Sequence, residues 1–254
     1  IRLSLVGSEM CIRDRLYTIP NKRILYHFVK PMPIRTSALR ALGAHGNVFA
    51  LESFMDELAY LAEADPVEFR LRHLDNPRAR MVVERAAEAF GWSSDPLPEN
   101  VGRGFGFAQY KNMAAYCAVA LTLRVEPETG RIAVGNVAAA VDSGEAVSLD
   151  GIRNQIEGGI VQSLSWTLYE EVVFDRSRVT SIDWSSYPML RFASVPETMV
   201  VHVIDRPGEP FLGTGEAAQG PAAAAIGNAV RHATGKRMTT LPLSRERVIQ
   251  SLDA

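Results

Sequence analysis

Two long apolar segments joined by a short turn constrain the fold of this chain more than any other feature. Residues 114–126, AAYCAVALTLRVE, and residues 131–142, RIAVGNVAAAVD, both have an extended, alternating character. The four residues between them, PETG at 127–130, have the composition of a tight turn. We therefore predict a long antiparallel β-hairpin in the middle of the chain.

The residues before the hairpin have helical spacing. Asn47 is predicted to cap a helix over residues 48–64, where apolar residues recur at helical intervals. The dipeptides DP at 65–66 and NP at 76–77 each join a capping side chain to a proline suited to a first helical turn. They predict two further short helices, the second ended by Gly91. We interpret the apolar faces of all three as core.

A polar, proline-containing stretch, SSDPLPENVGRG at 93–104, predicts the main internal boundary of the chain. Beyond the hairpin, the pattern predicts a helix, two strands and a final alanine-rich helix; these lie, in order, at about 151–171, around 179–183, around 198–205, and from Pro221 to a stop at Gly235. The fold class is therefore α+β. We expect an extended segment plus a helical subdomain over 16–92 and an α+β part over 93–254.

Composition excludes several classes of function. The 27 basic and 29 acidic residues nearly cancel, and no cluster of lysine and arginine indicates a nucleic-acid surface, so a small-molecule partner is expected. Apolar runs fall short of the roughly 18 residues that a membrane span needs, so no membrane anchor is predicted. The two cysteines, Cys11 and Cys117, are far apart and form no metal-binding motif. Any metal must be held in another way.

Three glycine-containing stretches can be interpreted either structurally or functionally. In GRGFGFA at 102–108, strand-like sequence follows the glycines, so we favour a flexible entry into the hairpin over a dinucleotide loop, which would need a helix directly after Phe107. In RTSALRALGAHGN at 35–47, Arg35 and Arg40 favour an anion site, and pairing with an acid such as Glu52 or Asp56 is equally open. In NQIEGGIVQSLSW at 154–166, tight helix packing by the two glycines is slightly favoured over ligand contact, which Gln155 and Gln162 would support.

A lone carboxylate, Glu216, lies in the small-residue stretch FLGTGEAAQGPAAAA at 211–225. Small neighbours would leave it accessible to a substrate, and partial desolvation favours a general base. The dipole of the helix that follows acts in the opposite direction. From the residues alone, a plain acid at the helix N-terminus is the favoured interpretation.

From Tyr17 onward the chain resembles the C-terminal part of the molybdopterin-binding large subunit of the xanthine dehydrogenase/aldehyde oxidase family, of the isoquinoline 1-oxidoreductase and nicotinate dehydrogenase B type. The stretches that carry the resemblance are YTIPNKR at 17–23, RTSALRALGAHGNVFALESFMDELA at 35–59, DPVEFRLRHLDNPRA at 65–79, GRGFGFAQYKN at 102–112, AAVDSGEAVSLDGIRNQIEGGIVQ at 139–162, SYPMLRF at 186–192 and GTGEAAQGPAAAAIGNAV at 213–230. It implies an incomplete molybdopterin-binding domain, because the larger, upstream part of such a subunit is absent.

The resemblance implies a molybdenum hydroxylase, which oxidises a heteroaromatic or aldehyde substrate with oxygen derived from water, using a glutamate as base toward a molybdenum-bound hydroxide. Glu216, in GTGE, matches that catalytic glutamate. Gln155 matches a glutamine near the cofactor, and Arg40 matches an arginine whose backbone N–H lies beside the metal ligands. Gly215 is counted with the cofactor-binding residues. Ala41 stands where many members have glycine.

The same resemblance implies partners and cofactors. The pterin, rather than protein side chains, would hold the molybdenum, and the cytosine dinucleotide form of the cofactor is expected. A small subunit with two-iron, two-sulfur clusters would relay electrons, with a cytochrome c as a further acceptor. The alternative is a non-catalytic fragment or scaffold that cannot retain cofactor. The compartment, cytoplasm or periplasm, is left open.

Residues 1–15 match nothing expected before YTIPN. Their apolar run is interrupted by Ser8 and Glu9, unlike a signal peptide. The string SLVGSEMCIRDR instead resembles translated sequencing-adapter sequence, a contaminant of gene models from environmental DNA. We therefore expect an artefactual, disordered leader in which Leu5, Met10 and Ile12 stay outside any core.

Overall fold

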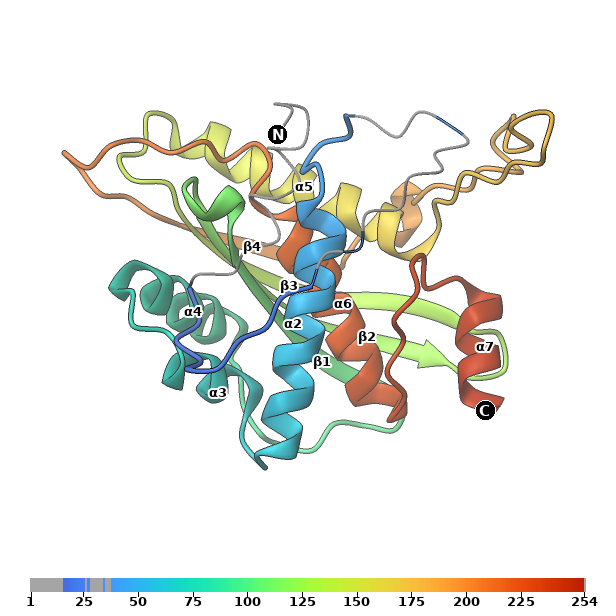
Figure 1. Ribbon diagram of the computed structural model, residues 1–254, viewed down its shortest axis with the longest axis horizontal. Coiled ribbons are helices and arrows are strands. Elements are labelled where there is room, and N and C mark those ends of the chain that lie inside the picture. Colours follow the sequence, from blue (N-terminus) through green and yellow to red (C-terminus); the bar gives the residue numbers. More distant parts are fainter. Residues whose placement is uncertain (1–15, 26, 28–33, 35–37, 254) are drawn as a thin grey trace.

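The computed structural model describes residues 16–25, 27, 34 and 38–253 (Figure 1). Its helices are α2 (Ala44–Leu61), α3 (Pro66–Arg72), α4 (Pro77–Phe90), α5 (Leu149–Leu168), α6 (Gln219–Thr234) and α7 (Arg245–Asp253), and its strands are β1 (Val101–Gln109), β2 (Tyr116–Glu126), β3 (Arg131–Asp142) and β4 (Thr198–Ile204). Two short 3-10 turns, η2 (Tyr110–Asn112) and η3 (Phe192–Ser194), complete the described elements. The α+β class is confirmed. The expected leader, with Leu5, Met10, Cys11 and Ile12, lies outside the described residues, and the division of the chain at 93–104 stays a prediction.

The four strands form one sheet in the order β1-β2-β3-β4. The predicted hairpin is confirmed: β2 and β3 pair antiparallel from Tyr116 opposite Asp142 to Glu126 opposite Arg131, with one irregularity between Leu121 and Leu123. β1 pairs antiparallel with β2, whereas β4 pairs parallel with β3. Because a parallel neighbour needs a crossover, α5 and a segment that projects from the body of the fold separate β3 from β4 (Figure 1).

Helix α6 lies unusually close to strand β1, and three glycines permit it. A Cβ atom added to Gly102, Gly104 or Gly106 would lie 2.0, 2.0 or 2.2 Å from a carbonyl oxygen of α6, in Ala229, Ala225 and Pro221 respectively. The contacts repeat every second residue of the strand, a rise of about 6.8 Å, and every fourth residue of the helix, a rise of about 6.0 Å. Because these two distances are similar, each glycine faces an equivalent position on the helix. We call this contact the glycine seam.

The seam corrects the interpretation of GRGFGFA as a flexible entry into the hairpin. Gly102, Gly104 and Gly106 lie inside β1, which continues without a helix to Gln109, so a dinucleotide-binding loop is excluded there. The phenylalanines between them, Phe105 and Phe107, point to the opposite face of the sheet, as period-2 alternation requires. They pack there in a core with residues of α2, α3 and α4.

The two faces of the sheet therefore carry separate cores. On the seam side, side chains of β2 and β3 pack with those of α5, α6 and α7. Helix α2 crosses α6 near the β1 edge (Figure 1), where a Cβ added to Gly220 or Gly227 would meet Val48 or Phe49 at 2.8 and 2.6 Å. Helix α2 thus depends on the same α6 backbone as β1 does.

A buried ionic network joins the helices to β1. Glu52 of α2 is fully buried and accepts hydrogen bonds from the hydroxyl of Tyr17 at 2.7 Å, Nε of Arg70 at 2.8 Å and the backbone N–H of Phe107 at 3.0 Å. Asp56 pairs with Arg70 at 3.3 Å and with Arg237 at 3.4 Å. The open alternative in which Glu52 or Asp56 pairs with Arg40 is not realised, because both carboxylates pair with Arg70 instead.

The predicted helix ends are confirmed in part. Asp65 and Asn76 cap α3 and α4 by accepting backbone N–H bonds, and Gly91 and Gly235 end α4 and α6 in the left-handed conformation. The cap at Asn47 is wrong: α2 begins three residues earlier, at Ala44, and the Asn47 N–H already donates to Gly43.

Two further expectations need correction. The strand around 179–183 is wrong, because that segment makes only an isolated bridge between Phe174 and Val179. Its alternating residues project with the loop and have no neighbouring strand. The sequence interpretation also missed α7, a short helix whose buried Val248 contacts the seam-side core.

We predict that Gly104→Ala lowers the free energy of unfolding by about 3 kcal/mol, because the new Cβ would force α6 away from β1. Gly158→Ala is the matched control, since the space beside Gly158 in α5 is open and alanine favours helix by about 1 kcal/mol. Urea unfolding of the purified proteins measures both. Equal effects of the two substitutions would show that the seam is not tightly packed.

Asp142, fully buried at the end of β3, supplies a second test. Burial raises the pKa of its carboxyl, but hydrogen bonds from Arg78, Arg206 and the Gly144 N–H outweigh burial and hold the pKa below its usual value. A carboxyl whose pKa is lower in the folded than in the unfolded protein stabilises the fold above its unfolded pKa, and that stabilisation is lost as the pH falls through the folded pKa.

We therefore expect Asp142→Asn to lower the free energy of unfolding by about 3 kcal/mol at neutral pH, because two arginines lose their counter-ion. The difference from the unsubstituted protein should shrink as the pH falls below about 4. Urea titrations at about pH 7 and pH 3 measure it. A difference that stays constant with pH would contradict the role of the ionised carboxylate.

Candidate functional site

The structure brings together all four residues predicted to form the site, Arg40, Gln155, Gly215 and Glu216. The guanidinium of Arg40 donates from Nε to the carbonyl oxygen of Gly215. A terminal nitrogen donates to the side-chain oxygen of Gln155 at 3.0 Å and to its backbone oxygen at 3.1 Å, and the other terminal nitrogen donates to Gln162 at 3.3 Å. One arginine therefore links α5 to the loop before α6.

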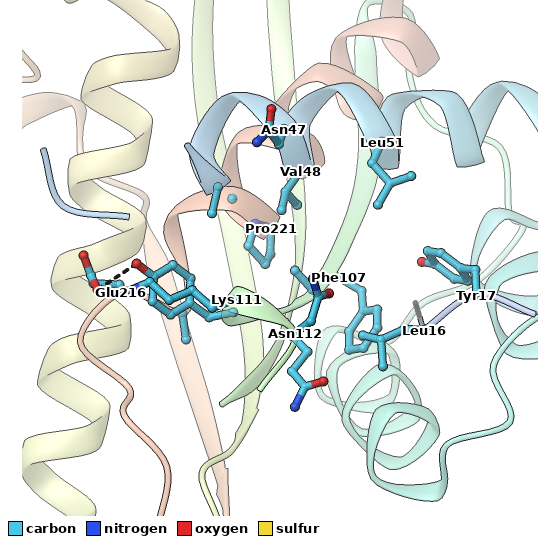
Figure 2. A pocket seen from close by; sticks show the side chains of 16 residues that line it. Leu16, Tyr17, Asn47, Val48, Leu51, Phe107, Lys111, Asn112, Glu216 and Pro221 are labelled. Carbon is cyan, nitrogen blue, oxygen red and sulfur yellow. Dashed lines mark hydrogen bonds between the residues drawn. The ribbon is translucent and has the colours of Figure 1, made fainter. Parts of the chain in front are cut away.

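Two donors from different parts of the chain hold the carboxylate of Glu216. The backbone N–H of Ala41 donates to Oε1 at 2.9 Å, and the hydroxyl of Tyr110 donates to Oε2 at 2.7 Å. The second bond is the dashed line at Glu216 in Figure 2. Glu216 lies three residues before the first residue of α6, and so it is not the plain helix N-terminal acid that the sequence favoured.

Helix geometry explains the glutamines. Gln155 and Gln162 lie seven residues apart on α5, which places them on one face two turns apart. Gln219, the first residue of α6, is fully buried; with its amide oxygen toward Arg40 it accepts from Nε at 2.7 Å, and its amide nitrogen donates to the Glu216 carbonyl at 3.1 Å. We call Arg40, Gln155, Gln162 and Gln219 the amide cluster.

The two adjacent glycines of α5, Gly158 and Gly159, have different surroundings. A Cβ added to Gly159 would lie 3.2 Å from both Ala218 and the side-chain amide of Gln219, so Gly159 serves the tight packing that the sequence favoured. Gly158 faces open space. The side chains of Gln155 and Gln162 on the same helix contact Arg40 instead.

Sequence reasoning missed Tyr110 and Gln219. Tyr110 follows the last residue of β1, and Gln219 lies three residues after Glu216. Tyr110 precedes Glu216 by 106 residues, and the packing of α6 on β1 brings its hydroxyl to the Glu216 carboxylate. Gln219 could have been found from the QG step at the start of the alanine-rich helix, a polar residue ahead of an otherwise apolar run.

Burial shifts the pKa of two ionisable groups near the site, Arg40 and His45. Burial lowers the pKa of Arg40, and the neighbouring Glu216 carboxylate opposes this shift. Burial lowers the pKa of His45 to about 4, and its Nε2 lies 3.3 Å from the Thr167 hydroxyl with the Trp166 ring against it. His45 is therefore neutral and contacts residues at the end of α5, so it is a weak proton acceptor at neutral pH.

Glu216 also lines a small pocket, with an interior of about 50 Å³, between the start of α2, the end of β1, η2 and the loop before α6 (Figure 2). Val48, Leu51, Phe107 and Pro221 supply apolar walls, and Lys111 and Asn112 supply polar groups, as Figure 2 shows. The carboxylate thus stands between the pocket and the amide cluster.

Protein side chains offer no obvious metal centre in the described part of the chain. Within residues 16–25, 27, 34 and 38–253, no three histidine, cysteine or acidic side chains are grouped to hold a metal. Burial raises the pKa of the Cys117 thiol to about 12, which leaves it protonated inside the sheet. In the same residues, no helix combines the length and apolar character that a membrane crossing requires.

Comparison with known proteins identifies the family of this chain. Models of the molybdopterin cofactor-binding domain match residues 50–196 and residues 4–74. The chain is 39% identical to a subunit of the nicotinate dehydrogenase of Pseudomonas putida over 250 residues, which cover 93% of this chain and 21% of that protein. It is 32% identical to the beta subunit of the isoquinoline 1-oxidoreductase of Brevundimonas diminuta over 207 residues, covering 81% of this chain and 26% of that protein.

A solved structure has the same fold. The aldehyde oxidoreductase of Desulfovibrio gigas superposes with a TM-score of 0.78 at 15% identity, over 98% of this chain and 45% of that chain. This chain therefore spans between a fifth and a half of the length of the proteins it matches. One matched range begins at residue 4, inside the expected leader, whose origin stays a prediction.

The backbone at Ala41 provides a test of the site's geometry. Ala41 has a φ of 69° and is fully buried, a conformation that glycine adopts freely and β-branched residues resist. We expect Ala41→Val to lower the free energy of unfolding by about 2 kcal/mol or more. Ala41→Gly, the matched control, should change it by less than about 1 kcal/mol. Thermal unfolding measures both, and a valine variant as stable as the glycine variant would contradict the strained backbone.

Proposed function

The chain belongs to the molybdopterin cofactor-binding family of the xanthine dehydrogenase and aldehyde oxidase enzymes, and we propose that it forms the C-terminal part of a molybdenum hydroxylase large subunit. In this proposal Glu216 is the general base for oxidation of a heteroaromatic or aldehyde substrate. The observation that carries it is the position of the Glu216 carboxylate, between an open pocket and the amide cluster.

The residues present fit a molybdopterin cofactor. The amide cluster presents one guanidinium and three neutral amides, which can donate to and accept from the heteroatoms of a pterin. Gly215 has no side chain, and an added Cβ would meet only the Gln155 oxygen, at 3.6 Å, so the backbone there is open to close approach. Arg40, Gln155 and Gly215, with Gln162 and Gln219, would hold the cofactor. When bound, it supplies the two-electron oxidation and activates the water-derived oxygen.

The chain's own residues then bind, orient and move one proton. Glu216 would accept that proton from the water-derived oxygen as the oxygen bonds to an electrophilic carbon of the substrate. The hydride displaced from that carbon carries the two electrons that the bound cofactor would take up. Ala41 and Tyr110 hold the carboxylate in place through their hydrogen bonds. The apolar walls of the pocket favour a planar, uncharged ring or an aldehyde over a highly charged substrate.

The electrons released by this oxidation must leave the protein. The resemblance to subunits of nicotinate dehydrogenase and isoquinoline oxidoreductase supports a small partner that carries two-iron, two-sulfur clusters, with a cytochrome c as acceptor beyond it. The cytosine dinucleotide form of the cofactor belongs to the same proposal. Both rest on the relatives rather than on a surface of this chain.

We expect Glu216→Gln to lower kcat by about 100-fold or more without loss of molybdenum, because the amide keeps the shape of the side chain but cannot accept the proton. Dye-linked dehydrogenase activity and molybdenum content of the complete purified enzyme measure the two effects. Glu128→Gln, at an exposed glutamate in the β2–β3 turn, is the matched control and should leave both unchanged.

Two outcomes would count against the proposal. Activity that survives Glu216→Gln would exclude Glu216 as the base. An unsubstituted enzyme that is inactive and contains no molybdenum would favour the alternative, a scaffold that cannot retain cofactor.

A further inference from the structure

We propose that Tyr110 is a positioning residue that fixes the orientation of the Glu216 carboxylate toward the pocket. The proposal rests on the function assigned to Glu216 and adds a residue that acts through it. Tyr110 belongs to η2, directly after β1, and its side chain is almost fully buried. Its hydroxyl is the donor to Oε2 of Glu216.

The two donors at Glu216 act as a clamp. Tyr110 holds Oε2, while the Ala41 N–H holds Oε1, and the two donors come from chain segments about 70 residues apart. A carboxylate with a donor on each oxygen cannot rotate about its last bond without breaking at least one hydrogen bond. The clamp therefore selects one orientation of the base, and preorganisation of this kind is what a general base needs.

Backbone strain is concentrated at both donors. Six residues other than glycine have a positive φ in the described part of the chain, and four of them adjoin the clamp; these are Ala41 at 69°, Leu42 at 49°, Lys111 at 53° and Asn112 at 56°. Each such residue costs of the order of 1 kcal/mol or more and persists only where the surrounding structure requires it. Here both strained pairs place a donor against the same carboxylate.

Two cations, Arg40 and Lys111, lie near the clamp. The guanidinium of Arg40 interacts electrostatically with Glu216 but directs its hydrogen bonds to Gly215, Gln155 and Gln162. The Lys111 ammonium lies 5.0 Å from the centre of the Tyr110 ring, against its face. The cation thus packs on the tyrosine and helps to keep the ring in place, which leaves the hydroxyl directed at the carboxylate.

The chain supplies a matched control for this interaction. Tyr187 donates to Glu170 at 2.8 Å, which is again a tyrosine hydroxyl on a glutamate carboxylate, but in the projecting segment between α5 and β4. Tyr187→Phe removes the same kind of hydrogen bond as Tyr110→Phe does. Neither Tyr187 nor Glu170 lines the pocket.

We expect Tyr110→Phe to lower kcat about 10-fold with KM changed less than about two-fold and molybdenum content unchanged, because phenylalanine keeps the ring in the pocket wall and removes the hydroxyl that holds Glu216. Tyr187→Phe should leave kcat and KM unchanged. In a Glu216→Asp background, whose shorter side chain already leaves the clamp, Tyr110→Phe should cause little further loss. That non-additivity separates an effect through Glu216 from a general weakening of the fold.

A second readout does not depend on activity. Carbodiimide coupling of Glu216, quantified by peptide mass spectrometry on the same enzyme preparations, should rise about three-fold in Tyr110→Phe, because a carboxylate that loses a donor spends more time free to react. The rate in Tyr187→Phe should stay unchanged. Glu128 serves as the internal reference in every sample.

Unchanged kcat and unchanged coupling in Tyr110→Phe would overturn the proposal, as would a rise in KM with constant kcat, which would make Tyr110 a substrate contact. A full additional loss in the Glu216→Asp background would assign Tyr110 a role independent of Glu216. Failure of the proposed function is a separate result, namely activity that survives Glu216→Gln, and the coupling rate still tests the clamp in that case.

Discussion

The close contact between α6 and β1 at the glycine seam determines where the rest of the structure can lie. Gly102, Gly104 and Gly106 let the helix backbone approach the strand backbone to a distance that no side chain would allow. The strand and the helix run in opposite directions along this contact, so the end of β1 and the start of α6 meet at the same end of it. Tyr110 follows that end of β1, and Glu216 precedes that start of α6. The seam therefore assembles the clamp from two segments that are distant in sequence.

Two kinds of partner hold the carboxylates, and they separate the buried structural carboxylates from the partly buried candidate functional one. Glu52, Asp56 and Asp142 are each held by arginines, in pairs that break only at a large cost in stability. Glu216 accepts instead from a backbone N–H and a tyrosine hydroxyl, which fix its direction without adding a formal positive charge at either oxygen. A carboxylate bound in this way can gain a proton without leaving an arginine unpaired, as a base must.

The sequence predicted those features whose cause is local. The turn PETG, the caps at Asp65 and Asn76 and the stops at Gly91 and Gly235 each depend on a few adjacent residues, and all are confirmed. The resemblance to a family predicted Arg40, Gln155, Gly215 and Glu216 as one site, and the structure places them together. The roles of those four residues stay a proposal.

The features that sequence reasoning missed depend on a partner elsewhere in the chain. Glycines in GRGFGFA have the same composition whether the segment is a flexible loop or a strand under a helix, and only the alanine-rich partner 115 or more residues later decides between them. Residues 179–183 have strand-like composition, but no neighbouring strand is available to pair with them beyond one bridge. Asn47 lost its capping role because the turn at Ala41 and Leu42 starts the helix earlier.

The packing at the seam offsets the energetic cost of the strained turns. The free energy of the folded state is raised by four residues beside the clamp whose backbone has a positive φ, namely Ala41, Leu42, Lys111 and Asn112. Dense packing at the seam and the buried pairs around Glu52 offset that cost, because they hold β1, α2 and α6 in positions from which the strained turns cannot relax. The packing of the body of the fold thus keeps the Glu216 carboxylate in one orientation. A substitution that weakens the packing of α6 on β1 should therefore disorder the clamp under milder conditions than those that unfold the protein, because the strained backbone is concentrated at the clamp.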